Sequence, residues 1–234
     1  MSASLLTITG LRASYGESLA LHGIDLVVGQ GETVTLLGRN GSGRSTTLKA
    51  IVGLVPGVQG SIRFGQTELV GRPSHEIARL GVGYCPEDRG IFAALSTEEN
   101  LLLPPVLADT GLSLDEIYTL FPNLRERRNS PGTRLSGGEQ QMLAMARVLR
   151  TGARLLLLDE ITEGLAPVIV RTLGHALERL KGRGFTIVLA EQNFRFAAPL
   201  ADRHYVIEHG RVVEMVGRGQ LETRMGSIAR HLGL

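Results

Sequence analysis

Gly38-Arg39-Asn40-Gly41-Ser42-Gly43-Arg44-Ser45-Thr46 lies between an apolar run, residues 33–37, and the start of a helical pattern. The segment has the spacing of the phosphate-binding loop (P-loop) G-x-x-x-x-G-K-[S/T], with Arg44 at the lysine position. In such a loop, backbone N–H groups surround phosphate oxygens, the cation binds the β and γ phosphates, and the hydroxyl holds Mg²⁺. A chain with 30 glycines can also match this short pattern by chance, so other segments have to decide.

Composition limits the classes of protein that fit this chain. Its 234 residues suffice for one α/β domain with a sizeable core. Lys and Arg number 25 against 23 Asp and Glu, without long runs of one sign, so we expect no nucleic acid as a partner. The single cysteine, Cys85, cannot form an internal disulfide, and no apolar run approaches the ~18 residues that cross a bilayer. We therefore expect a cytoplasmic chain that can bind a membrane protein.

Apolar runs and turn residues divide the chain into strands and helices. Two strands are expected to pair at the N-terminus, and a hairpin is expected around His209-Gly210. The expected strands are 5–14, 21–28, 33–37, 61–64, 82–85, 155–158, 186–190, 205–208 and 211–215. Helical spacing follows residues 44, 136 and 167, and short helices are expected in 219–234.

The middle of the chain differs in character. Capping boxes at Ser96 with Glu99 and at Ser113 with Glu116 predict short helices, so residues 96–133 are interpreted as a small helical insert. With the amphipathic helix that follows, the helical subdomain covers about 96–150. Strands and helices alternate elsewhere, which predicts one domain over 1–234: a doubly wound α/β core with antiparallel strands at its margins.

Two acidic residues follow a buried run. Four leucines, residues 155–158, are typical of a parallel strand covered on both faces, and Asp159 and Glu160 come directly after them. The carboxyl ends of such strands are where α/β sheets bind ligands. Beside the P-loop, Asp159 would hold Mg²⁺ with Ser45, and Glu160 would polarise the water that attacks the γ phosphate. The alternative is a strand end with solvated acids.

The segment Leu135-Ser136-Gly137-Gly138-Glu139 is a third motif. Locally it is a capping box that begins a helix, with a hydroxyl and glycine N–H groups at the positive helix end. Here the sequence resembles the ATP-binding cassette (ABC) family, whose signature is LSGGQ, with Glu139 at the glutamine position. The resemblance extends over nearly the whole chain and implies a P-loop NTPase (RecA-like) core, an N-terminal antiparallel β subdomain and a small α-helical insert.

The resemblance also assigns roles to single residues. An aromatic residue near the N-terminus stacks on adenine in this family, and Tyr15 has that position. Glu87 replaces a glutamine that senses magnesium and faces the membrane subunit, and residues 161–165 lie at the family's D-loop, where Ile161 replaces a frequent proline. Gln192 replaces the switch histidine; it can donate a hydrogen bond to the γ phosphate but cannot shuttle a proton.

The predicted site has three groups of residues. Glu160 and Gln192 are the catalytic residues, and Ser45, Glu87 and Asp159 are the Mg²⁺ ligands. The residues expected to bind ATP are Tyr15, Gly38, Arg39, Asn40, Gly41, Ser42, Gly43, Arg44, Ser45, Thr46, Ser136, Gly137 and Gly138. Outside the site, His204 and His209 are expected at the surface or in a turn, and Cys85 as a small buried residue.

Glu87, Gln192 and segments 98–101 and 163–167 resemble one branch of the family, the ATP-binding subunit of branched-chain amino acid importers. The resemblance implies an ATPase peripheral to the cytoplasmic face of the cell membrane. Its partners would be transmembrane permease subunits, a second cassette paired head to tail, identical or a paralogue, and indirectly a periplasmic or extracellular solute-binding protein. The alternatives are an ATPase subunit for urea or amide import, a soluble non-transport ABC ATPase, and a regulatory subunit that hydrolyses ATP weakly, which Arg44 would favour.

Overall fold

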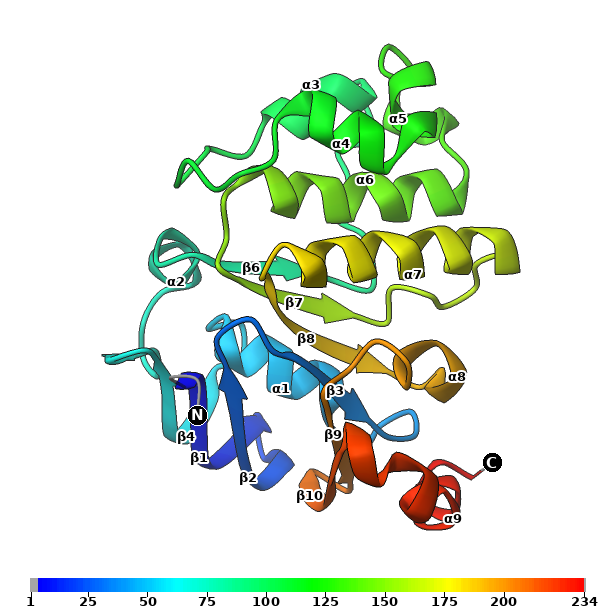
Figure 1. Ribbon diagram of the computed structural model, residues 1–234. Coiled ribbons are helices and arrows are strands. Elements are labelled where there is room, and N and C mark those ends of the chain that lie inside the picture. The colour runs from blue at the N-terminus through cyan, green and yellow to red at the C-terminus, as the bar shows by residue number, and fades with distance from the viewer. Residues whose placement is uncertain (1–3, 234) are drawn as a thin grey trace.

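The computed structural model describes residues 4–233. A four-stranded antiparallel sheet forms one margin of the molecule (Figure 1). Its strands, in the order β2-β1-β4-β5, are β1 (Ser4–Tyr15), β2 (Ser18–Gly29), β4 (Gly57–Phe64) and β5 (Thr67–Glu68). The N-terminal pair was predicted, and the turn between β1 and β2 is Gly16-Glu17. The expected strand at 61–64 begins earlier, at Gly57.

A six-stranded sheet forms the centre of the molecule, in the order β10-β9-β3-β8-β7-β6. All neighbouring pairs are parallel except the hairpin of β9 and β10. The strands are β3 (Thr33–Leu37), β6 (Val82–Cys85), β7 (Leu155–Asp159), β8 (Thr186–Glu191), β9 (Arg203–Glu208) and β10 (Arg211–Gly217). Every residue of β3, β7 and β8 is buried. This is expected for strands whose two faces are both covered by other elements.

Helix α1 (Arg44–Ile51) lies between the two sheets. It contacts β1 and β2 on one side and β7 and β8 on the other. Its apolar residues Leu48 and Ile51 are fully buried in one cluster with residues from both sheets. The antiparallel sheet therefore fixes the helix that begins at the P-loop.

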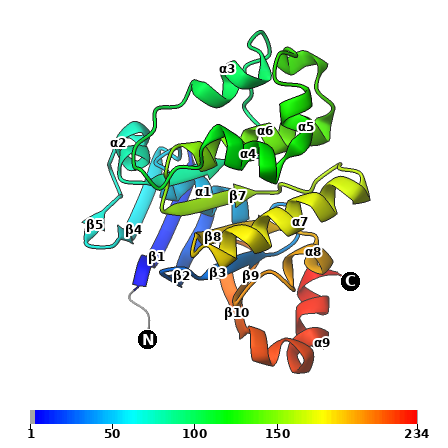
Figure 2. The ribbon, with the colours of Figure 1, turned by 45° about the horizontal axis from the view of Figure 1, so that its top comes forward.

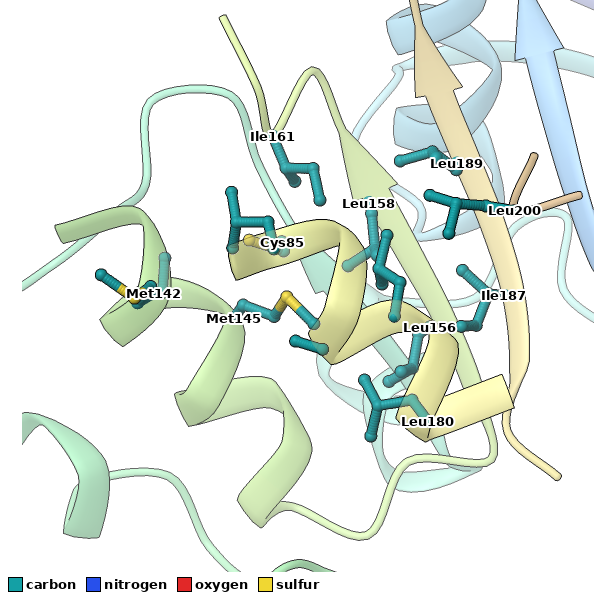
Figure 3. Close-up of a cluster of buried hydrophobic side chains, with 14 of the residues drawn as sticks. Cys85, Met142, Met145, Leu156, Leu158, Ile161, Leu180, Ile187, Leu189 and Leu200 are labelled. Atoms are coloured by element: carbon teal, nitrogen blue, oxygen red, sulfur yellow. The ribbon is translucent and has the colours of Figure 1, made fainter. Parts of the chain in front are cut away.

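The opposite face of the central sheet is covered by α6 (Gly137–Arg150) and α7 (Pro167–Gly182). Figure 3 shows Met145 of α6 and Leu180 of α7 meeting Leu156 and Leu158 of β7. Cys85 is fully buried in the same cluster, as predicted for a small apolar residue.

Three short helices lie on the outer side of α6 (Figure 2). They are α3 (Thr97–Leu102), α4 (Leu114–Leu120) and α5 (Pro122–Glu126), and a 3-10 turn, η1 (Gly132–Arg134), precedes α6. Both predicted capping boxes form: Ser96 Oγ accepts from Glu99 N at 3.2 Å, and Ser113 Oγ from Glu116 N at 3.2 Å. Apolar residues of α3 and α4 share one buried cluster with α6, α7 and the central sheet. The limits of the subdomain at about 96–150 stay a prediction.

The remaining elements differ from the expectations in number and length. Helix α2 (Ser74–Arg79) was not predicted; it buries only Ile77 and has no side-chain cap, so its sequence carries little helical signal. Helix α8 (Phe194–Ala197), also unpredicted, is one turn long. The C-terminal part contains one helix, α9 (Leu221–Leu232), after a 3-10 turn, η2 (Arg218–Gln220). Among residues 4–233, no helix has both the length and the apolar character that a membrane span requires.

Candidate active site

The site lies at one edge of the central sheet. β3, β7 and β8 are parallel neighbours, so the residues that follow them meet at their carboxyl ends. The loop 38–43 joins β3 to α1, Glu160 follows β7, and Gln192 follows β8. The parallel order of the strands thus collects segments that are far apart in the sequence.

Two glycines of the P-loop cannot be replaced without movement of the chain. A Cβ on Gly38 would lie 2.4 Å from the Ile207 carbonyl oxygen and 2.5 Å from Ser42 Oγ. Gly43 has a φ of 108°, a left-handed conformation that side chains disfavour, and its Cβ would lie 2.7 Å from Leu21. The loop therefore follows a tight path between β9 and β2 that only glycine permits.

The loop has the donors that a phosphate group needs. Within residues 4–233, no acceptor bonds the backbone N–H groups of residues 43–46, which open α1. The hydroxyl of Ser42 is likewise buried without a partner among the described residues. These groups border a cavity of about 350 Å³, lined also by Leu19, His22 and His209. Unpaired donors at a helix N-terminus fit phosphate oxygens.

Arg44 lies inside this loop and is 2% exposed. Its Nη1 donates to the Gly38 carbonyl oxygen, and its Nη2 lies 3.4 Å from Asn40 Oδ1. Nη2 also forms an ion pair with Glu160 Oε1 at 2.5 Å. The forked guanidinium thus bonds the loop and the predicted catalytic carboxylate at the same time, which the single ammonium of a lysine would do less well.

Asp159 is fully buried and bonded through both carboxylate oxygens. Ser45 Oγ donates to Oδ1 at 2.8 Å, and the Tyr84 hydroxyl donates to Oδ2 at 2.9 Å. Burial raises the pKa of Asp159, while these two hydrogen bonds oppose the rise. A hydroxyl and a carboxylate are the oxygen ligands that Mg²⁺ prefers, so the predicted pair Ser45 and Asp159 fits this ion. Tyr84 was not predicted.

Glu160 has a φ of 46°, an uncommon value for a side-chain-bearing residue, and its N–H donates to the Ala190 carbonyl oxygen at 2.9 Å. Burial raises the pKa of Glu160, a second carboxylate, Glu163, raises it further, and Arg44 opposes the rise. Carboxylate oxygens of Glu87, Glu160 and Glu163 lie within 4.8 Å of one another. The structure thus brings Glu87 to Glu160, while Asp159 is not part of that group.

Ser136, Gly137 and Gly138 begin α6, in the predicted capping box: Ser136 Oγ accepts from Glu139 N at 3.3 Å. Their surroundings are not the P-loop of the same chain. Gly137 lies beside Arg89, and Gly138 packs against Ile169 of α7. Ser136 is exposed at this helix N-terminus.

Two further predicted residues lie at the surface. Tyr15 is the last residue of β1 and is 44% exposed. The preceding residue, Ser14, pairs with Leu19 of β2, and Leu19 lines the P-loop cavity. Gln192 is exposed directly after β8. Both side chains are accessible to a nucleotide, but neither is bonded to the P-loop in the described chain.

The prediction for His204 was wrong, because this residue is fully buried. It lies on β9, which pairs with β3, and its Nδ1 lies 2.6 Å from Thr35 Oγ1. Burial lowers the pKa of His204 to about 4, so the ring is neutral at pH 7. His209 lies in the turn between β9 and β10 with a φ of 46°, as predicted, and it also lines the P-loop cavity.

Sequence reasoning missed a buried contact beside the site. Glu191, the last residue of β8, is 2% exposed, and its Oε1 accepts from Thr162 N at 3.1 Å and from Thr162 Oγ1 at 3.0 Å. Burial raises the pKa of Glu191 to about 7. The bond joins the segment 161–165 to the strand end that carries Gln192. Only the adjacency of β7 and β8 reveals this pair, which lies 29 residues apart in the sequence.

A parallel α/β sheet, a P-loop leading into a helix, and a carboxylate pair after a neighbouring strand define a nucleotide-binding domain of the P-loop class. The chain belongs to the ABC transporter family, whose profile matches residues 21–163. ATP-binding cassettes of this family hydrolyse ATP to power transport, and the chain is such an ATPase subunit. Cassettes of the family dimerise and work with transmembrane permease subunits.

The chain is similar to curated proteins of both import and export systems. It is 42% identical over 212 residues to the high-affinity branched-chain amino acid transport ATP-binding protein BraG of Pseudomonas aeruginosa, covering 89% of this chain and 91% of BraG. It is 32% identical over 214 residues to the lipopolysaccharide export system ATP-binding protein LptB of Escherichia coli, covering 89% and 88%.

Solved structures confirm the fold. The ADP conformation of MJ1267, an ATP-binding cassette of an ABC transporter, aligns with a TM-score of 0.80 at 19% identity over 96% of both chains. The dimeric bacterial cassette MJ0796 aligns with a TM-score of 0.81 at 23% identity, covering 91% of this chain and 98% of that one. The predicted fold, a P-loop NTPase core with an antiparallel β subdomain and helical insert, is confirmed.

Proposed function

We propose that this chain is the ATP-hydrolysing subunit of an importer for branched-chain amino acids. The observation that carries the proposal is the 42% identity with BraG over about nine-tenths of both chains. Glu87 and Gln192, which replace the residues usual in the wider family, are ordinary in the importer branch that the sequence resembles. Cargo passes through separate membrane proteins, so no residue of this chain would contact it.

The residues of the site divide the proposed chemistry among them. The free N–H groups of residues 43–46 would bind the phosphates, and Tyr15 would stack on adenine. Ser45 and Asp159 would hold Mg²⁺, with Glu87 at the edge of the site. The ion would neutralise charge on the β and γ phosphates.

Glu160 would accept the proton of the attacking water, for which its raised pKa is suitable. Gln192 would donate a hydrogen bond to the γ phosphate without exchanging a proton. Before Glu160 can act as a base, it has to leave its ion pair with Arg44. During turnover, the Arg44 side chain would therefore release the Glu160 carboxylate and bind the phosphates instead.

The site is complete only in a head-to-tail dimer. Ser136 to Gly138 lie at an exposed helix N-terminus whose neighbours are Arg89 and Ile169, not the P-loop of the same chain. In the dimer they would cover the nucleotide held by the partner's P-loop. ATP would close this dimer and hydrolysis would open it, and the movement would drive the permease subunits.

The permease subunits would bind beside the insert, at the cytoplasmic face of the membrane. Phe92, Leu102, Leu103 and Val106 are about half exposed, and large apolar side chains gathered this way mark a protein-binding surface. A groove of about 250 Å³ lies next to them, lined by residues of β6, the loop 86–90, the segment 104–107 and α6. A solute-binding protein outside the membrane would act on this chain only through the permease.

Crosslinking tests the dimer. Asn40→Cys places a thiol on the exposed loop and Ser136→Cys one on the signature, while the native Cys85 is buried. We expect the double variant to form a crosslink between two chains with MgATP and the permease present, and not without nucleotide. Ser113→Cys with Asn40→Cys is the matched control, because Ser113 is an exposed cap of the same geometry on α4. Equal crosslinking in both pairs would refute the head-to-tail dimer.

Reconstitution tests the cargo. The proteins that co-purify with the chain would be placed in vesicles, and ATP-dependent uptake of leucine, isoleucine and valine compared with uptake of urea and short amides. Uptake of the amino acids is expected. Uptake of urea or amides alone would place the chain in that branch, and outward movement of lipopolysaccharide would make the similarity to LptB the relevant one. A soluble complex without permease would point to a non-transport ATPase.

A second function is favoured by one observation, the buried ion pair of Arg44 with Glu160. A subunit that binds ATP but hydrolyses it weakly would keep this pair when nucleotide is bound. Single-turnover hydrolysis by the wild type and by Glu160→Gln distinguishes the two functions. An active ATPase loses about 10²-fold or more in rate on this change, whereas a regulatory subunit starts slow and changes little.

A further inference from the structure

The carboxylate of Asp159 is held from two sides by hydroxyl groups. Ser45 Oγ, from the first turn of α1, donates to Oδ1 at 2.8 Å, and the Tyr84 hydroxyl donates to Oδ2 at 2.9 Å. Tyr84 lies on β6, the strand that pairs with β7 at the edge of the sheet. The two donors thus come from different elements and fix different oxygens of one fully buried side chain.

The second contact has a fixed direction. The Tyr84 hydroxyl is the donor and the Asp159 carboxylate oxygen Oδ2 is the acceptor, at 2.9 Å. A hydrogen bond to a charged acceptor is stronger than one between neutral groups. Without it, Oδ2 would be a buried carboxylate oxygen that has lost its only hydrogen-bond donor among the described residues.

We propose that Tyr84 is a positioning residue for the Mg²⁺ site, which fixes the plane of the Asp159 carboxylate so that Oδ1 faces the ion beside Ser45. The proposal rests on the proposed function, in which Ser45 and Asp159 hold Mg²⁺. This ion requires nearly octahedral geometry with short ligand distances, so a carboxylate that rotates binds it less well. Outer partners that orient metal ligands typically change metal affinity 10- to 100-fold when removed.

A purely structural role makes a different prediction. If Tyr84 only satisfied a buried carboxylate, its loss would lower stability and leave metal affinity unchanged. Tyr84→Phe separates the two roles, because it removes the hydroxyl and keeps the ring. Tyr118→Phe is the matched control: the Tyr118 hydroxyl donates to Glu98 Oε2 at 2.7 Å on the insert, away from the site.

The experiment measures Mn²⁺, a paramagnetic substitute for Mg²⁺, by electron paramagnetic resonance in full-length protein with ATPγS bound. We expect Tyr84→Phe to raise the Mn²⁺ dissociation constant about 10-fold or more, while ATPγS affinity in the absence of metal changes less than about twofold. Tyr118→Phe should match the wild type in both. Each variant's melting temperature is measured alongside.

Equal Mn²⁺ affinity in the wild type and Tyr84→Phe would overturn the proposal, whatever the melting temperatures. A tenfold loss in Tyr118→Phe as well would also overturn it, because the effect would then not belong to the Asp159 contact. If the wild type itself bound ATPγS without binding Mn²⁺, the proposed metal site would fail together with the role of Tyr84. That outcome is distinct, since it appears before any variant is compared.

Discussion

Arg44 Nη2 and Glu160 Oε1 lie 2.5 Å apart, so the cation of the P-loop is bound to the carboxylate that follows β7. The same guanidinium bonds the Gly38 carbonyl oxygen through Nη1. Arg44 is almost completely buried, and the Glu160 side chain is only 12% exposed. Breaking such a pair without replacement is costly, so in the proposed mechanism nucleotide would supply the new partner for Arg44 before Glu160 becomes free.

Arg44→Lys should speed turnover and keep nucleotide binding. Lysine retains the charge but cannot bond Gly38 and Glu160 through a rigid fork, so the exchange to the phosphates becomes easier. We expect kcat to rise roughly tenfold, equivalent to about 1.4 kcal/mol in the barrier, with the ATP dissociation constant within about threefold. Steady-state ATPase assays and nucleotide titrations measure both.

Arg44→Gln is the control, because it removes the charge and retains hydrogen-bonding capacity. Its ATP affinity should fall, since the phosphates lose their cation. If Arg44→Lys leaves both kcat and affinity as in the wild type, the loop tolerates either cation and the ion pair does not limit turnover.

The adjacent glycines of the signature should respond differently to alanine. A Cβ on Gly138 would lie 2.8 Å from Ile169 Cγ1, so Gly138→Ala should separate α6 from α7 and lower the free energy of unfolding by about 1–3 kcal/mol. A Cβ on Gly137 meets only the flexible end of Arg89, at 3.3 Å. The free energy of unfolding of Gly137→Ala, measured in urea, should therefore lie within about 0.5 kcal/mol of the wild-type value. The same variant should nevertheless show less ATP-driven crosslinking. Equal stabilities would mean that Ile169 moves aside freely.

Local patterns predicted the parts of the fold that depend on neighbouring residues. The capping boxes at Ser96, Ser113 and Ser136 form as expected, because such a box involves only four consecutive residues. The four leucines before Asp159 form the predicted buried strand. This prediction also depended only on consecutive residues, because a continuous apolar run is typical of a parallel strand that is covered on both faces.

Contacts between distant strands were beyond the reach of those patterns. Tyr84 and Asp159 lie 75 residues apart, and their bond exists only because β6 and β7 are neighbours. His204 was misplaced because the expected strand began only at residue 205, which left His204 at the surface or in a turn, whereas β9 begins at Arg203. The sheet order, in which β3 pairs with β9, buries it beside Thr35. The roles of the predicted site residues stay predictions.

Glu191→Gln should stabilise the protein at alkaline pH. Burial raises the pKa of Glu191 to about 7 from an ordinary 4.5, so the folded state binds more protons than the unfolded state between these values. The free energy of unfolding therefore falls as pH rises through this window. Glutamine keeps the acceptor for Thr162 N and carries no charge. Between pH 5 and pH 8, the free energy of unfolding of the variant, measured in urea, should rise by about 2–3 kcal/mol relative to that of the wild type.

Glu178→Gln is the control for this measurement, because Glu178 lies exposed on α7. It should follow the wild type at both pH values. A Glu191→Gln variant whose difference from the wild type is the same at pH 5 and pH 8 would show that Glu191 is already charged in the folded protein at pH 5.

His204 should act in the opposite direction. Its pKa falls to about 4 from an ordinary 6.5, so the unfolded state binds more protons in that window and stability is lost as pH falls. From pH 8 to pH 5 the wild type should lose about 2 kcal/mol relative to His204→Gln, measured by urea unfolding at each pH. In the wild type, the contributions of Glu191 and His204 to the change in unfolding free energy with pH nearly cancel. The two single variants should therefore show slopes of opposite sign when unfolding free energy is plotted against pH. The double variant should show neither slope. Parallel pH profiles in all four proteins would mean that neither buried group is linked to folding.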